Sequence, residues 1–409
     1  MKALTREHFG AALAALLAVG LVGRVIFDLK TRGVVYDLDS LQLVGNALRV
    51  HPGTVYTVAN ANPLFPRWPY PPGFFPVILL CRAIADHTGL GFEHVIRFPT
   101  IICDLVIAWL VQDFLGWRGA SHGRRLGAAA LVALGPSFAA ISAIHGQIDA
   151  DGIMPAVAAV VVWERRIGRR AVLAGALIAI GAVIKSVPAV VLLALLPSVD
   201  SRREAAELIG AALAVALVAV GPYVVHDGLH WFHNLNYNGG IGLGGLSLVA
   251  QPDLALNWLH VGQAPISSLS SHLHNISRVI AALGVLGAFA VAWRGRASAP
   301  VAATLLFLAV YAFGVTFFMQ YMVWGLPFML LAGYVWQVLA LEALLFAPVY
   351  VIYHGVTAAW AGSVFYVVPM LVAWAVLIVS LGLLGRRVLR GRERAAPAPH
   401  DGLTISRPV

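Results

Sequence analysis

A succession of long apolar runs, separated by short basic loops, constrains this chain more than any other feature of its sequence. Hydrophobic residues make up 60% of the 409 residues and charged residues only 11%, and the mean hydropathy is +0.82. The longer runs match the roughly 20 residues that a helix needs to cross a bilayer. The sequence therefore predicts an all-α polytopic membrane protein whose surface faces lipid over most of its area.

The positions of the basic residues predict which loops lie in the cytoplasm. A formal net charge of +9 would suggest a nucleic-acid partner in a soluble protein. Here, however, Lys and Arg gather in short loops such as 118–125 and 165–170, as they do in cytoplasmic loops of membrane proteins. We therefore expect no nucleic-acid partner. The pattern predicts about 12 crossings of the plasma membrane, with both termini in the cytoplasm.

The chain divides into two transmembrane modules and a tail. We expect a first module over residues 1–200 with an external loop at 29–95, and a second over 201–394 with an external loop at 226–272. The boundary near residue 200 is not marked by a linker. Residues 395–409, with their Pro, Ala and Gly, predict a disordered cytoplasmic tail.

Three apolar segments require a separate prediction of where their helices begin and end. Residues 73–88 are too short and too charged to cross easily, and they predict an amphipathic helix on the outer surface. Residues 171–197 predict two short segments that meet at Lys185, because a single crossing would place the next basic pair outside. Near the C-terminus we expect one run over 322–340 and the next over 341–353.

Two carboxylates one residue apart, Asp37 and Asp39, follow the first apolar run directly. Their place in the sequence predicts that they lie at the outer surface of the membrane, within reach of a lipid headgroup. The alternative is that they cap the helix after them, since Asp is favoured at N-caps and the apolar spacing that follows is helical. Both roles can be true at once.

Other polar residues gather on the same predicted side of the membrane. Ionisable groups at membrane depth are costly and are rarely present without a partner or a function. For Arg97 the structural alternative is that its side chain snorkels, or pairs with Asp104 on the same helix. With the two acids, the following residues predict an outward-facing site: Tyr70, Arg97, His145, Gln147, Asp149, Lys185, Gln320 and Tyr321.

The order of these motifs resembles the GT-C superfamily of polyprenyl-phosphate-sugar-dependent glycosyltransferases. The similarity extends from about residue 10 to 330, and it is seen with the polyprenol-phosphate-mannose mannosyltransferases and the dolichol-phosphate-glucose glucosyltransferases. The motifs that carry it are the acidic pair, Tyr70-Pro71-Pro72, the span that opens with Arg97 and contains Asp104, and the stretches 145–149, 185–188 and 320–327. Leu41 departs from the family pattern, which usually has an aromatic residue there, so the resemblance leaves open which acid is catalytic.

The resemblance implies a GT-C fold with amphipathic helices in the first external loop, a conserved first module and a variable second one. It also implies transfer of a hexose, mannose or glucose, from a polyprenyl-phosphate donor to an acceptor hydroxyl on the outer face of the membrane. A single base suffices for this chemistry, because the phosphate leaves as a stable anion and needs no proton at once. Asp37 and Asp39 are the candidates, with Asp37 preferred, and the reaction inverts the anomeric carbon.

The remaining candidates would bind the donor and the acceptor. Lys185, Arg97 and His145, in falling order, are expected to stabilise the negative charge that develops on the phosphate. Because these cations are available, we expect no metal and no other cofactor, although some family members bind a divalent cation through such acids. The expected partners are the lipid-linked donor, a lipid-anchored or cell-wall glycan acceptor, and membrane lipids.

Two other classes of membrane protein are alternatives. A secondary transporter or a flippase of lipid-linked sugars also has many spans with buried charges, but it usually shows two related halves, and no such repeat is seen here. An O-antigen polymerase or ligase would be expected to carry an arginine-rich external loop. The loop at 226–272 has no Lys or Arg.

Overall fold

The structure is a computed structural model that describes residues 6–61, 68–228, 230, 268–314, 319–354 and 364–391. Within these ranges every regular element is a helix, which confirms the predicted all-α class. Most of the expected external loop 226–272 and the whole tail 395–409 lie outside the described residues.

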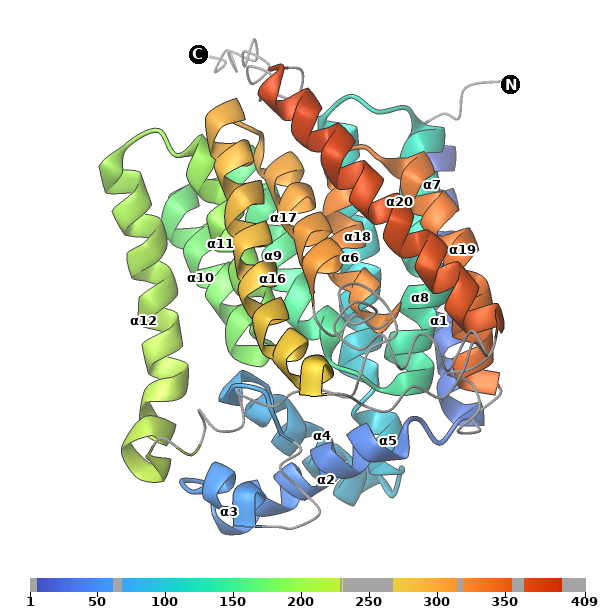
Figure 1. The fold of residues 1–409 in the computed structure, drawn as a ribbon. Coiled ribbons are helices and arrows are strands. Elements are labelled where there is room, and N and C mark those ends of the chain that lie inside the picture. Colours follow the sequence, from blue (N-terminus) through green and yellow to red (C-terminus); the bar gives the residue numbers. More distant parts are fainter. Residues whose placement is uncertain are drawn as a thin grey trace, which may run out of the picture.

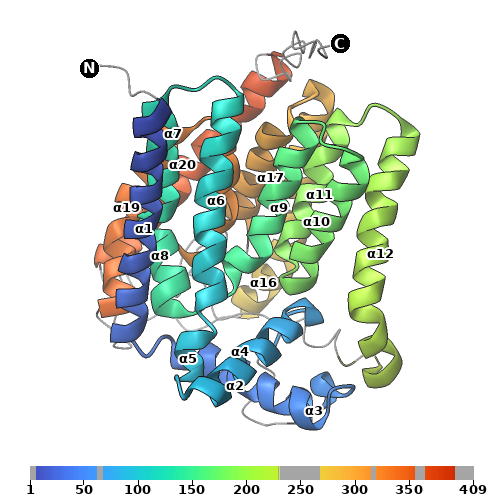
Figure 2. The same ribbon diagram turned by 180° about the vertical axis from the view of Figure 1, so that it is seen from behind.

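Two groups of helices, one from each half of the chain, run side by side in a bundle (Figure 1). The first group is α1 (Arg6–Lys30), α6 (Phe98–Trp117), α7 (His122–Ala133), α9 (Asp149–Glu164), α10 (Arg170–Ile184), α11 (Val190–Leu195) and α12 (Arg202–Asp227). The second group is α16 (Ser268–Gly295), α17 (Ala299–Phe313), α18 (Met322–Leu331), α19 (Val335–His354) and α20 (Val364–Leu389). The view from behind shows α12 at the edge of the bundle, packed against α10 (Figure 2).

Six helical stretches are long and apolar enough to span a membrane: His8–Lys30, Phe92–Trp117, His122–His145, Arg202–Asp227, Val335–Tyr353 and Val368–Leu389. Shorter apolar helices, including α10, α17 and α18, lie between them. Large apolar side chains on α12, such as Leu217 and Val218, are exposed on the outside of the bundle, where lipid would cover them. The chain is therefore a polytopic membrane protein, and the figure of about 12 crossings stays a prediction.

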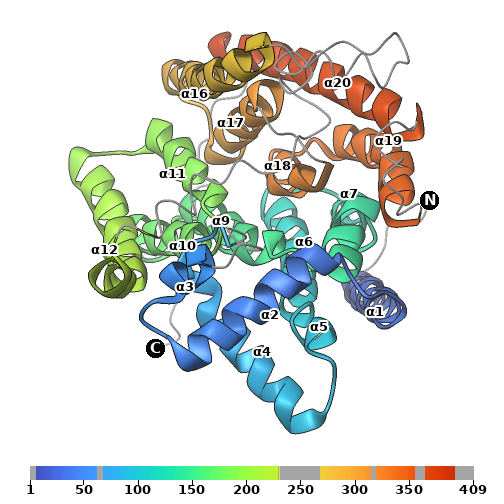
Figure 3. The ribbon, with the colours of Figure 1, turned by 60° about the horizontal axis from the view of Figure 1, so that its bottom comes forward.

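A separate layer of helices lies across one end of the bundle, at the end opposite to the start of α1 and the end of α20 (Figure 1). It consists of α2 (Val35–Val50), α3 (Val55–Ala61), η1 (Pro72–Phe74), α4 (Phe75–Thr88) and α5 (Phe92–Val95). Figure 3 shows the layer from a viewpoint nearer its outer side. The layer occupies the stretch predicted as the first external loop, and its position outside the cell stays a prediction.

The layer has its own small core and a link to the bundle. Helix α4 buries Phe75, Ile78 and Cys81 on one side and exposes Leu80 on another, so the helix expected at 73–88 is confirmed. At the end of α12, the buried Asp227 carboxylate accepts hydrogen bonds from the backbone N–H groups at the start of α3, at 2.5 Å and 3.0 Å. Asp227 therefore caps α3 from a distant part of the chain.

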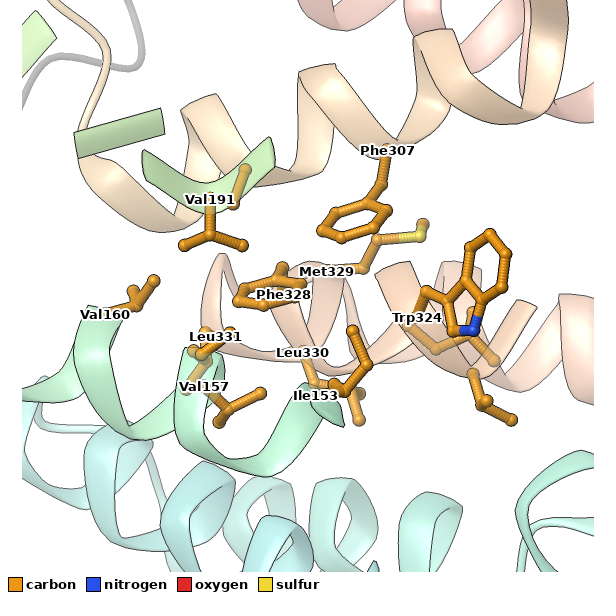
Figure 4. Packing of buried hydrophobic residues seen from close by; sticks show 14 of the residues in the cluster. Ile153, Val157, Val160, Val191, Phe307, Trp324, Phe328, Met329, Leu330 and Leu331 are labelled. Atoms are coloured by element: carbon orange, nitrogen blue, oxygen red, sulfur yellow. The ribbon is translucent and has the colours of Figure 1, made fainter. Parts of the chain in front are cut away.

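The core of the bundle joins helices from both halves of the chain. Ile153 and Val157 of α9 face Phe328 and Leu331 of α18 (Figure 4). The ring of Phe328 stacks on that of Phe307 in α17, with ring centroids 5.1 Å apart. Since lipid is as apolar as these side chains, their association depends on close packing rather than on removal from water.

The helix ends agree with the sequence analysis at one break and differ at another. Lys185 is extended (φ −145°, ψ 126°) between α10 and the next helical segment, so the two short segments predicted over 171–197 are confirmed. The boundary expected between residues 340 and 341 is wrong, because α18 ends at Leu331 and α19 begins at Val335. Gly333 makes this turn, with φ +89° and its N–H donating to the Leu330 carbonyl at 2.9 Å.

Two buried ion pairs join α1 to α6. Asp104 of α6 lies 3.4 Å from the guanidinium of Arg24 in α1, and both side chains are buried. The alternative pairing of Asp104 with Arg97 does not occur, since Arg97 pairs with Asp28 at 2.5 Å. Each pair joins α1 to α6, and neither charge is left alone at membrane depth.

Candidate active site

Asp37 lies in the first turn of α2, at the junction between the outer layer and the bundle. The N-cap of this helix is Val34 and no side chain caps it, so neither Asp37 nor Asp39 is an N-cap residue. The side chain of Asp37 is 24% exposed and borders a small pocket. The pocket is lined by Asp37, Ser40, Leu41, Trp68, Tyr70, Gly146, Gln147 and Ile148.

His145 holds the Asp37 carboxylate. Its Nε2 lies 2.6 Å from Asp37 Oδ2, and its Nδ1 lies 2.6 Å from the hydroxyl oxygen of Tyr353 in α19. An ionised carboxylate can only accept a hydrogen bond, so Nε2 carries a proton. In the neutral tautomer Nδ1 then accepts from the Tyr353 hydroxyl, and the chain of contacts runs from Tyr353 through His145 to Asp37.

An irregular helix brings His145 to this place. After α7 and the short α8 (Pro136–Ala139), residues Ala140–His145 form a π-helix, η2, which ends at Gly146. Gly146 has φ +86°, and a Cβ there would stand 2.9 Å from Leu38 in α2. The His145 carbonyl also accepts the N–H of Val34 at 3.1 Å. The π-helix and the start of α2 are therefore in direct contact.

The surroundings of Asp37 favour its ionised form. Burial opposes ionisation and is the largest influence, but the hydrogen bond and charge of His145, a hydrogen bond from Gln147 and the charge of Lys185 together outweigh it. The net effect lowers the pKa of Asp37 below its ordinary value. Asp37 therefore carries its negative charge at neutral pH.

Tyr70 and Gln147 form the wall of the pocket beside Asp37. The Tyr70 hydroxyl donates to Gln147 Oε1 at 3.3 Å, and the Tyr70 ring meets the Trp68 ring edge-on at 5.1 Å. The Tyr70 carbonyl accepts the Tyr56 hydroxyl at 2.9 Å. These contacts fix an aromatic face next to an ionised carboxylate, an arrangement that suits a sugar ring with its apolar and hydroxyl-bearing sides.

Lys185 lies behind Tyr70 and forms a buried ion pair with Asp149, at the start of α9. The Lys185 ammonium also faces the rings of Tyr70 and Trp324, 5.2 Å and 5.5 Å from their centroids. Trp324 Nε1 donates to the same Asp149 oxygen, Oδ1. Asp149 Oδ2 is buried and has no hydrogen-bond partner among the described residues.

Tyr321 extends this aromatic group. Its ring stacks on Trp324 with centroids 4.1 Å apart, and its carbonyl accepts the Tyr311 hydroxyl at 2.9 Å. Gln320 is half-buried next to it in η5 (Met319–Tyr321). The turn before α18 therefore packs against Trp324, one of the two rings that face the Lys185 ammonium.

The structure brings most of the predicted site residues together but separates two of them. Asp39 is exposed on α2 and does not line the pocket. Arg97 is fully buried and contacts the end of α1 and the π-helix instead of the pocket. Asp37, Tyr70 and Gln147 line the pocket, His145 contacts Asp37, and Asp149, Lys185 and Tyr321 lie behind it. Gln320 precedes Tyr321 in η5.

Two residues of this neighbourhood were not predicted. Tyr353 contacts His145 across 208 residues of sequence, and nothing in its own stretch indicated this. Trp324 belongs to the motif 320–327, where its indole could have been noted as a donor for a buried acid. Among the described residues, no group of three or more His, Cys, Asp and Glu side chains is placed to hold a metal ion. The expected absence of a metal stays a prediction.

Comparison with known proteins gives one family and no curated relative. The model for glycosyltransferase family 87, a GT-C-type family, matches residues 68–319. This stretch covers more than half of the chain and includes Tyr70, His145 and Lys185. No curated protein matches the chain.

Proposed function

Because the chain belongs to glycosyltransferase family 87, we propose that it transfers a hexose, mannose or glucose, from a polyprenyl-phosphate donor to an acceptor hydroxyl at the outer face of the plasma membrane. The observation that carries the proposal is the 2.6 Å contact between His145 and Asp37 at the wall of a pocket. It supplies one ionised carboxylate near the junction of the bundle and the outer layer, with the cation of Lys185 close behind.

The reaction needs one base and no acid. Asp37 accepts the proton of the acceptor hydroxyl while the hydroxyl oxygen attacks the anomeric carbon from the face opposite the phosphate. The bond between that carbon and the phosphate oxygen breaks, and its electron pair leaves with polyprenyl phosphate. The sugar is transferred with inversion, and the proton stays on Asp37 until it passes to solvent.

Lys185 is the residue that we assign to the donor phosphate. Its charge contributes to the lowered pKa of Asp37, so the two groups lie within electrostatic reach of one another. Negative charge grows on the phosphate as the bond breaks, and a cation in a site from which water is excluded stabilises that charge strongly. Asp149 balances Lys185 when no donor is bound, and the phosphate must compete with it for the ammonium.

The aromatic face of Tyr70 would support the sugar, and the exposed side of the pocket would admit the acceptor. We propose a lipid-anchored or cell-wall glycan as the acceptor, reached from the outer leaflet. The proposal needs no cofactor, since Lys185 supplies the positive charge. Family membership argues against the transporter and flippase alternatives, and no observation on the described residues favours a polymerase or ligase.

The test uses the purified full-length protein in liposomes, supplied with radiolabelled polyprenyl-phosphate-mannose or -glucose and a lipid extract of membranes as acceptor. We expect one donor to release polyprenyl phosphate and to label the extract. Asp37→Asn keeps the shape of the side chain but removes the base, so it should lower the rate on the order of 10²–10⁴-fold.

Asp39→Asn is the matched control, because it makes the same change two residues away at an exposed position. It should keep nearly the full rate. Loss of activity in Asp39→Asn with full activity in Asp37→Asn would transfer the base to Asp39. Full activity in both would remove the carboxylate from the mechanism and contradict the proposal.

A further inference from the structure

Arg97 is the most heavily hydrogen-bonded side chain near the site, although it does not border the pocket. It stands at the N-cap of α6, and its side chain is fully buried. Its Nε lies 2.5 Å from Asp28 Oδ1 and donates to the Glu93 carbonyl at 2.8 Å. Its terminal nitrogens donate to Thr31 and to the Ala143 carbonyl at 2.9–3.0 Å.

These contacts leave no donor of the guanidinium for a ligand. The group has five N–H bonds, and they are directed at Asp28, Thr31, Glu93, His94 and Ala143. A donor phosphate could reach Arg97 only by breaking several of these contacts inside the protein. A direct role in phosphate binding is therefore disfavoured by the geometry.

Two of the acceptors, Thr31 and Ala143, belong to the segments that lead to Asp37 and to His145. Thr31 lies in the short link between α1 and α2, just before Asp37, and Ala143 lies in the π-helix, just before His145. The stem of Arg97 also packs beside Gly146, where an added Cβ would stand 3.3 Å from it. One side chain thus touches both segments on the side away from the pocket.

We propose that Arg97 is a positioning residue, which holds the link before α2 and the π-helix in register so that His145 meets Asp37. This inference rests on the proposed function, because it gives Arg97 its importance through Asp37. A planar guanidinium is needed, since it bonds several carbonyl oxygens at fixed angles, whereas the single ammonium of Lys cannot reach both segments.

The test compares Arg97→Lys with Arg170→Lys. Arg170 is another buried arginine, paired with Glu204 at 2.5 Å, at the other end of α10 from Lys185. Both variants are assayed on the folded fraction, as the full-length protein in liposomes with the donor found active. We expect Arg97→Lys to lower kcat by about 10-fold or more with little change in KM for the donor, and Arg170→Lys to leave both unchanged.

The pH dependence separates positioning from simple loss of stability. Titratable groups face Asp37 from several elements: His145 from the π-helix, Tyr353 through His145, Lys185 from the end of α10, Tyr70 across the pocket and Tyr321 before α18. If Arg97→Lys moves His145 away, Asp37 loses its main hydrogen bond and the acidic limb of the rate profile shifts to higher pH. A raised KM for the donor with an unmoved acidic limb would instead make Arg97 a phosphate ligand and overturn the proposal.

A second measurement does not depend on activity. In protein with ¹⁵N-labelled histidine, the wild-type His145 should give the signals of a ring protonated at Nε2, and Arg97→Lys should alter them while Arg170→Lys does not. Unaltered signals in Arg97→Lys would overturn the positioning role. If the signals change but the rate does not, Arg97 positions the pair and the proposed function of Asp37 is the part that fails. Should Arg97→Lys not fold, Thr31→Val removes one acceptor and is expected to give the same changes at smaller size.

Discussion

Asp37 and Asp39 have different surroundings although a single residue separates them. Side chains two residues apart on a helix point in different directions, so only one of them can face the π-helix. Asp37 meets His145, while Asp39 is exposed. The geometry of the helix therefore gives the two acids different surroundings. Asp37, the more enclosed of the two, has a lowered pKa and so stays ionised throughout the physiological pH range.

The pH dependence of activity should report on this environment. Because the pKa of Asp37 is lowered from its ordinary value of about 4, the wild-type kcat/KM should not fall until the pH drops below that value. His145→Phe removes the hydrogen bond and leaves burial to act, so the pKa should rise and the acidic limb should move to higher pH. Rate profiles of both proteins between pH 4 and 8 test this.

The same shift has a consequence for stability, with a definite sign. A carboxylate with a lowered pKa in the folded state stabilises the protein above its unfolded pKa, and this contribution is lost as the pH falls through the folded value. In His145→Phe burial raises the Asp37 pKa, so this contribution should be missing at neutral pH and the stability should fall less than in wild type as the pH is lowered, which thermal unfolding at several pH values can show. Identical profiles for the two proteins would contradict the assignment of His145 as the partner of Asp37.

Substitutions of Lys185 and of its ion-pair partner Asp149 should have opposite effects on KM for the donor. Lys185→Met should raise KM for the donor about 10–100-fold, because a hydrogen bond to a charged group contributes about 1.5–3 kcal/mol. Asp149→Asn should lower KM for the donor and strengthen inhibition by polyprenyl phosphate, since the phosphate no longer competes with a carboxylate. Donor titrations in liposomes give both values, and an unchanged KM in both variants would remove this pair from the donor site.

At the scale of single elements, the π-helix Ala140–His145 is the element that builds the site. An extra residue in one turn rotates the side chains that follow it, and such irregular turns are frequent at functional sites. Gly146 ends this element with φ +86°, close to Leu38. Gly146→Ala should lower both stability, by about 1–2 kcal/mol for the backbone, and kcat, because Leu38 must move and Asp37 lies next to it.

Gly119 provides the matched control for this substitution. It has a similar φ of +79°, but a Cβ there would meet nothing within 4 Å. Gly119→Ala should therefore lose similar stability while kcat stays unchanged. Thermal unfolding and kcat, measured on both variants, separate the backbone strain from the displacement of the site, and equal values of kcat would count against a role for Gly146 beyond the backbone.

Helix ends show how far the sequence could predict the elements. The break at Lys185 was predictable, since the parity of the basic loops required two short segments there. The turn between α18 and α19 was not, because the sequence is apolar on both sides of Gly333 and hydropathy gives no minimum at the turn. In a membrane bundle, core-facing and lipid-facing residues are both apolar, so hydropathy locates a span more easily than its end.

At the scale of the whole molecule, the predicted orientation can be tested by labelling in intact cells. A cysteine at His87, exposed at the end of α4, should react with an impermeant maleimide, and a cysteine at Arg169, in the loop between α9 and α10, should not. The native Cys81 is a poor reporter, because burial, aided by the charge of Asp151, raises its pKa to about 11. The reverse labelling pattern would invert the topology and place Asp37 in the cytoplasm.

The assembly of the site from distant segments limited what the sequence could predict. Asp37, Tyr70, His145, Asp149 and Lys185 were selected because polar residues at predicted membrane depth require a reason. Their pairing was not predictable, since it depends on how α2, the π-helix, α9 and α10 meet. The same holds for Tyr353, which lies in an apolar helix and whose contact with His145 depends on the packing of α19 beside the π-helix.

The cap that Asp227 places on α3 has a consequence for biosynthesis. The chain is made from its N-terminus, so the outer layer emerges from the ribosome long before α12 does. Until Asp227 arrives, the first N–H groups of α3 can bond only to water. We therefore expect α3 to be anchored to the bundle only after α12 has been inserted, and a ribosome stalled before that helix to hold a layer whose α3 is still without this anchor.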